Sequence, residues 1–194
     1  DIKLIFDPIN FSINAKTIGP KLKLKNEIID IENIKTQVSL RSLINNQFSL
    51  ENLEISSKSL KIKDLISFIR GINNSSELYV LEKIIRKGYL ITDIKIDFDD
   101  TGKIKDNYSI NGLVKDIEID FFNKYNVKDL SFIFNFKNKQ LTTKDSSFKF
   151  NDLNFFSEEI SVKQIKDGFS VKALINSDKA SLSEKKIKEF INPF

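Results

Sequence analysis

The residue types that most often carry catalysis or bind transition metals are missing from this chain of 194 residues, which has no Cys and no His. Their absence excludes thiol catalysis, His general-base chemistry, disulfide scaffolds and ordinary zinc sites. Carboxylates, hydroxyls and lysines remain, so any chemistry depends on how these are spaced. A few short motifs bring such groups together, and each lacks a required part.

The segment Asp100-Thr101-Gly102 resembles the triplet of aspartic proteases. That chemistry needs two carboxylates sharing a proton, usually from two such triplets, and the chain has one. Asp97, Asp99 and Gly102 also match part of a calcium-binding EF-hand loop, but Tyr108 stands where the bidentate Glu is required. We therefore expect a hairpin turn here, and neither a protease site nor a metal site.

Ser57-Lys58 places a hydroxyl beside an amine, as in Ser–Lys hydrolases, but no oxyanion site or glycine elbow accompanies the pair. The chain is therefore predicted not to be an enzyme and to need no cofactor.

Basic and acidic side chains alternate closely along the chain, with 31 Lys and Arg against 27 Asp and Glu, a formal net charge of +4. Only Arg41, Arg70 and Arg86 are Arg. Phe148-Lys149-Phe150 interleaves rings with a cation, a pattern that can stack nucleic-acid bases. Interspersed charge instead favours a solvated surface, and we expect no nucleic-acid partner.

No stretch of the sequence approaches the roughly 20 apolar residues that a transmembrane helix requires. No signal peptide opens the chain, and no Met occurs anywhere, even at position 1. We expect the chain to be a piece of a longer protein, with any export signal or membrane anchor upstream of Asp1.

The main pattern is apolar–polar alternation with a period of two, which places alternate side chains on opposite faces of a strand. It is clearest at residues 94–98, 117–121 and 130–136, and shorter runs occur at 22–24, 60–62, 148–150, 160–162 and 171–173. Turn residues separate the runs at 99–102, 123–126, 137–139, 151–152 and 166–168. The sequence therefore predicts an antiparallel meander of strands.

Helical patterns occur at about 64–87 and 183–192. In the first, Asp64 is a possible N-cap and Gly71 a possible stop, and Ser75 or Ser76 then begins a second helix that ends at Gly88. Ser183 is a possible cap of the C-terminal helix, which stops before Pro193. The layout predicts two units, 1–88 and 89–194, each a set of strands with a helical segment, or one continuous sheet.

Alternation gives such a sheet one apolar face, and that face has to be covered. A second sheet covers it in a sandwich, and a barrel fills its own interior. The expected helices are few and lie at the ends of the strand blocks. A long sheet that curls without closing would instead present an apolar groove.

Two segments carry a family resemblance: Ser49–Arg70 reads SLENLEISSKSLKIKDLISFIR, and Ser76–Phe121 includes the strand Ile110-Asn-Gly-Leu-Val114. Over about residues 38–176 this pattern resembles the AsmA-like and TamB-related proteins of Gram-negative bacteria. The resemblance implies a mostly β, antiparallel, strongly curved open sheet of the repeating β-groove type. It also implies a segment of a periplasmic bridge-like protein that guides phospholipids between the inner and outer membranes.

The resemblance further implies an inner-membrane anchor outside this chain and protein partners in the periplasm or outer membrane, which the sequence does not identify. It brings no catalytic residues, so a role in lining the groove is assigned through alternation alone. The expected lining residues are Ile94, Ile96, Phe98, Ile117, Ile119, Phe121, Leu130, Phe132, Phe134, Phe136, Phe148 and Phe150. The alternative is a closed all-β structural or protein-interaction module without lipid transport.

Overall fold

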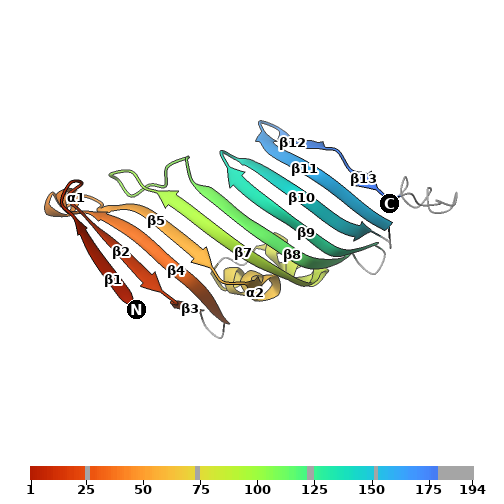
Figure 1. The fold of residues 1–194 in the computed structure, drawn as a ribbon, viewed down its shortest axis with the longest axis horizontal. Helices are drawn as coiled ribbons and strands as arrows, with labels where there is room; N and C mark the ends of the chain where they lie inside the picture. The colour runs from red at the N-terminus through yellow and green to blue at the C-terminus, as the bar shows by residue number, and fades with distance from the viewer. Residues whose placement is uncertain (25–26, 73–74, 122–124, 151–152, 179–194) are drawn as a thin grey trace.

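The computed structural model describes residues 1–24, 27–72, 75–121, 125–150 and 153–178, which form one antiparallel sheet with three short helices (Figure 1). The first strands are β1 (Ile2–Asp7), β2 (Ser12–Ile18), β3 (Lys21–Leu24), β4 (Glu27–Ser39), β5 (Leu50–Ser57) and β6 (Leu60–Lys61). The others are β7 (Ile85–Asp97), β8 (Ser109–Phe121), β9 (Tyr125–Lys137), β10 (Gln140–Phe150), β11 (Leu153–Ile165), β12 (Gly168–Ala173) and β13 (Asn176–Ser177). The helices are α1 (Leu40–Ile44), α2 (Ile62–Ile72) and α3 (Ser76–Ile84).

The strands pair in the order β1-β2-β4-β5-β7-β8-β9-β10-β11-β12, with β3, β6 and β13 paired beside this path. The sheet is not closed into a barrel, and β1 and β12 lie at its two far ends (Figure 1). The predicted class, a mostly β, antiparallel open sheet with short helices, is confirmed. The sheet is continuous through residue 88, which lies inside β7.

The hairpin turns predicted at 99–102, 137–139 and 166–168 are present. Asn138 and Lys139 both have positive φ, 52° and 59°, as the tight turn between β9 and β10 requires. The turns expected at 123–126 and 151–152 include residues outside the described ranges. These short connections are the reason that consecutive strands pair as neighbours over most of the sheet.

The helical region expected at 64–87 contains α2 and α3, with different ends from those predicted. Gly71 does not stop α2, which runs on to Ile72. The Ser75 hydroxyl caps α3 by accepting a hydrogen bond from the Leu78 N–H at 3.3 Å. Gly88 does not end α3: the helix stops at Ile84 because Ile85 pairs with Ile119 of β8 and is buried there. The helix expected at 183–192 lies outside the described residues, and α1 was not predicted.

A row of backbone irregularities crosses neighbouring strands, at Gly88 in β7, Asp116 in β8, Asp129 in β9 and Asp145 in β10. Each has positive φ, and the three Asp residues lie at 53°, 55° and 50°. An extra residue at such a β-bulge keeps the side chains before and after it on one face. Simple alternation fails at these points, although the apolar face continues across them.

Gly88 is needed for close packing as well as for its φ of 144°. A Cβ there would lie 2.7 Å from Ile117 Cγ1 and 3.2 Å from Ile62 Cδ1. The missing side chain lets α2 approach β7 and β8. The buried apolar cluster forms at this place from Ile62 and Ile66 of α2 and from Ile85, Val114 and Ile117 of the sheet.

Candidate functional site

One face of the sheet is apolar from its first strand to its last, and we call it the apolar face. Directly paired residues share a face, so the register defines an unbroken row across all ten strands of the path. The row contains Ile2, Thr17, Ile34, Ile55, Ile94, Ile110, Phe136, Leu141, Val162 and Val171. Thr17 is its one polar member. At about 4.8 Å between strands, the row is about 43 Å long.

The register places eleven of the twelve expected lining residues on the apolar face. Phe98 lies one residue past β7 and bridges to Ile104. Ile94 and Phe136 belong to the ten-strand row itself. Ile117 pairs with Leu130, and Phe132 with Val114, on the two sides of the bulge at Asp116. Ile34, Ile55, Leu141 and Val162 share this face but were not among the expected residues. The register of β4, β5, β10 and β11, which links them to the row, is not visible in short alternating runs.

Aromatic rings are packed along the C-terminal half of the apolar face. Phe148 and Phe155 stack with their ring centroids 5.3 Å apart. Phe132 and Phe134 meet edge to face at 6.2 Å. These rings support one another within the layer and are half-buried. Side chains that meet their neighbours in this way form a continuous apolar floor.

Helices α2 and α3 cover the apolar face at one end of the strands. They pack on β7, and α2 also contacts β4 and β6. Beneath them Val114 and Ile117 are buried. In the described part of the chain, the main contacts of β9, β10 and β11 are with neighbouring strands. Leu130, Phe132 and Phe134 of β9 pack against the buried cluster that includes α2. The floor on β10 and β11 is not covered by a second layer of the residues described.

The two helices are tied to each other by polar contacts. Arg70 of α2 forms an ion pair with Glu82 of α3, and the Ser67 hydroxyl donates to the same carboxylate at 3.0 Å. The Arg70 guanidinium also lies over the ring of Tyr79, 5.1 Å from its centroid. The pair acts as one unit that closes a single end of the face.

The opposite face of the sheet is mostly polar. Glu54 lies between Lys35 and Lys95 across three strands, at 3.8 and 3.5 Å. Asn135 donates its side-chain N–H to the Asn111 side chain on the neighbouring strand. Such exposed pairs contribute little free energy, but they mark a solvated surface.

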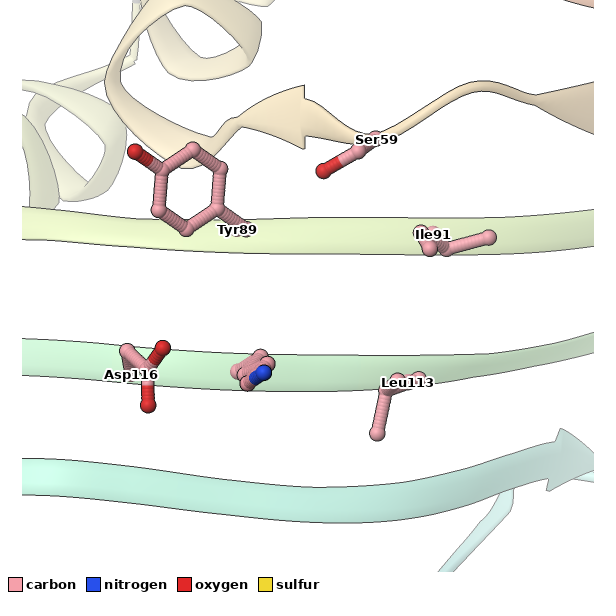
Figure 2. Close-up of a pocket in the computed structure, with 6 residues that line it drawn as sticks. Ser59, Tyr89, Ile91, Leu113 and Asp116 are labelled. Carbon is pink, nitrogen blue, oxygen red and sulfur yellow. The ribbon is translucent and has the colours of Figure 1, made fainter.

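A shallow hollow interrupts the polar face over β7 and β8 (Figure 2). Ile91 and Leu113, which pair directly, line it together with Ser59, Tyr89, Lys115 and Asp116. Ile133 of β9 pairs with Leu113 and extends this small apolar patch. Alternation alone assigns these three side chains to the face away from the groove, and the structure places them there.

The Asp99 carboxylate has a structural role. It accepts hydrogen bonds from the Thr101 N–H and hydroxyl at 2.8 and 2.7 Å, and from the Lys103 N–H at 3.0 Å. These bonds, the Thr101 hydroxyl first, lower the pKa of Asp99 below its ordinary value. The motif that resembled a protease triplet or an EF-hand is thus a turn held by its own aspartate.

Within the described ranges, no three Asp or Glu side chains gather in a group that could hold a metal ion. Helices long and apolar enough to cross a bilayer are also absent from the described residues. Comparison with protein-family models, with curated proteins and with solved structures finds no match to this chain.

Proposed function

We propose that this chain is a segment of a periplasmic, bridge-like lipid transfer protein. Its apolar face binds phospholipid acyl chains and guides lipids between the inner and outer membranes. The observation that carries the proposal is the in-register apolar row across the ten strands of an open sheet. The family resemblance to AsmA-like and TamB-related proteins supports the same proposal, with the membrane anchor and protein partners outside this chain.

The dimensions of the row suit a path better than a pocket. Half of a hydrocarbon core of about 30 Å gives about 15 Å for one acyl layer. A row of about 43 Å, nine strand spacings of about 4.8 Å, is nearly three times that length. Several lipids could lie along it one after another, each covering a few strands.

The mechanism requires no covalent chemistry. Contact between acyl chains and isoleucine, leucine or phenylalanine side chains is non-directional, so a lipid can shift along the row without losing a specific bond. Headgroups remain in water at the uncovered side of the sheet. Direction comes from lipid supply at one membrane or from an energised partner.

The competing function is a protein-interaction module. A closed, self-packed module does not describe this chain, because the sheet is open. An interaction module would therefore have to bind a partner polypeptide over the apolar face. That face is long and mostly apolar, and hydroxyls on it such as those of Thr143 and Ser146 already bond to each other. It therefore offers a polypeptide few places to satisfy its backbone hydrogen bonds. Acyl chains have no such requirement.

The test compares two charges on adjacent residues of β9. Phe134→Asp places a carboxylate on the apolar face, and Ile133→Asp places one on the polar face. The chains are purified without detergent, and the phospholipid extracted per chain is measured by mass spectrometry. Wild type and Ile133→Asp should carry phospholipid, whereas Phe134→Asp should lose at least tenfold, because a buried charge in contact with acyl chains is costly.

Folding is monitored by far-ultraviolet circular dichroism. Phe148→Asp is a second variant on the apolar face, should Phe134→Asp unfold. A wild-type chain that is repeatedly free of lipid contradicts the proposal. Equal lipid loss from Ile133→Asp and Phe134→Asp does so as well. If a polypeptide co-purifies with the wild type in equal amount and is lost from Phe134→Asp, the result would support the interaction module instead.

A further inference from the structure

Several strand connections lie at the end of the sheet away from α2 and α3 (Figure 1). Exposed apolar side chains gather on three of them. They belong to the β1–β2 turn, to α1 with the residues after it, and to the β7–β8 loop. We call this set the apolar rim: Ile9, Leu43, Ile44, Phe48 and Ile104. The later connections at the same end, at 138–139 and 166–167, are polar.

Contacts join the three connections into one strip. The Leu40 N–H donates to the Phe11 carbonyl at 3.0 Å, which ties α1 to the β1–β2 turn. The rings of Phe48 and Phe98 lie 5.6 Å apart, and Phe98 bridges to Ile104 within the β7–β8 loop. The strip spans β1 to β7, four strand spacings, or about 19 Å.

Each connection is held by a local side-chain cap that leaves its apolar residue projecting. Asp7 accepts from the N–H groups of Ile9 and Asn10, at 3.0 and 3.1 Å. Ser39 caps α1, and Asp99 holds the β7–β8 loop. Ile9 is 92% exposed and Ile44 70% exposed, so these side chains point away from the fold. The tips are preorganised, which lowers the entropic cost of binding.

The charges beside the apolar tips carry both signs. Arg41, Lys103 and Lys105 are interspersed with Asp100 and Asp106. A layer of zwitterionic headgroups presents both signs at close spacing and complements this arrangement, whereas a uniformly anionic surface does not. A fluid acyl layer also accepts separate projecting tips without a matching set of pockets, which a protein partner would have to supply.

We propose that the apolar rim inserts into the surface of a zwitterionic phospholipid bilayer. The end of the sheet that α2 and α3 leave uncovered then faces the membrane. This inference deepens the proposed function, and rests on it for the lipid path, by placing the site where lipid enters or leaves the apolar face. Insertion is driven by apolar contact, so it persists at high salt.

The experiment is co-sedimentation with vesicles of phosphatidylcholine and phosphatidylethanolamine, at low and at high salt. The test variant is Ile9→Asn/Ile44→Asn/Ile104→Asn. The matched control is the pair Ile44→Asn and Ile72→Asn, because Ile72 is also 70% exposed but lies on α2 at the other end of the strands. The triple variant should bind vesicles at least tenfold more weakly. Ile44→Asn should weaken binding, and Ile72→Asn should leave it unchanged.

Wild type that fails to bind vesicles overturns the inference, as does a triple variant that binds like wild type or an equal loss from Ile72→Asn. If a second copy of the chain covers the rim instead, the wild type should be a dimer and the triple variant a monomer, with equal binding to vesicles. That result also overturns the inference. Phospholipid extracted per chain reports the proposed function separately. If the wild-type chain carries phospholipid but does not bind vesicles, membrane insertion of the apolar rim is wrong, and lipid binding by the apolar face still stands.

Discussion

The ring of Phe134 on β9 occupies the space beside Gly112, its directly paired residue on β8. A Cβ at Gly112 would lie 2.7 Å from Phe134 Cε1 and 2.3 Å from the Ile91 carbonyl oxygen. A large ring on one strand thus fills the gap left by a glycine on the next. The pair lies at the centre of the apolar face, between the row through Phe136 and the cluster under α2.

Gly112→Ala should therefore destabilise the chain by about 1–3 kcal/mol, because neither the backbone oxygen nor the packed ring can move freely. The matched control is Gly71→Ala in α2, where the nearest contact is Leu24 Cδ2, the free end of a flexible side chain. There the gain in helix propensity of about 1 kcal/mol offsets the displacement. Urea unfolding measures both, and equal effects would contradict this packing account.

The bulge at Asp116 gives a second prediction. Its φ of 53° suits Gly, Asp or Asn and disfavours β-branched residues. Asp116→Val should lose about 1–2 kcal/mol of unfolding free energy, whereas Asp116→Gly should stay within about 0.5 kcal/mol of wild type. Thermal unfolding of the two variants is the check. If Val is tolerated as well as Gly, the bulge is not fixed by this residue.

The cover that α2 provides can be tested on one helix. Ile66 is 6% exposed in the buried cluster, whereas Ile69 is 36% exposed. Ile66→Ala should cost about 2–5 kcal/mol, as expected for a large-to-small change in a core. Ile69→Ala should cost much less, since its side chain already contacts water. If denaturant unfolding shows a larger loss of stability for Ile69→Ala than for Ile66→Ala, the side of α2 that packs on the sheet is not the one that carries Ile66.

The ion pair between Asp129 and Lys149 predicts a dependence on pH. Lys149 Nζ lies 2.9 Å from Asp129 Oδ2, and this hydrogen bond, followed by the charge of Lys149, lowers the pKa of Asp129. A lowered pKa in the folded state stabilises the fold above the ordinary Asp value of 3.8 and loses that contribution as pH falls below it.

Lys149→Gln should therefore raise the pKa of Asp129 in a carboxyl-carbon NMR titration. Asp129→Asn keeps a residue that tolerates positive φ, so its difference in stability from wild type should shrink as pH falls below 3.8. The side chains are exposed, so the effect should also weaken with salt. An unchanged titration in Lys149→Gln would show that the two groups do not interact in solution.

Much of the fold follows from local pattern. The runs at 94–98, 117–121 and 130–136 form strands because their alternation buries one side of each. Ser75 caps α3 as the sequence predicts, but the C-terminal ends of the helices could not be predicted. Gly71 and Gly88 both resemble helix stops, yet Gly71 lies inside α2 and Gly88 lies in β7. Contacts remote in sequence decide both cases, with Leu24 beside Gly71 and Ile117 beside Gly88.

Local alternation is enough to tell which side chains share a face within one strand, because the strand repeat of two residues is a local property of the backbone. The composition of the chain also excludes thiol, histidine and ordinary zinc chemistry. The alignment of the ten strands depends on contacts that exist only in the folded chain. The bulges at Asp116, Asp129 and Asp145 restore the apolar parity, and pairing partners such as Ile55 and Ile94 come from distant segments. Register is set by non-local hydrogen bonding and packing, which no short window of sequence contains.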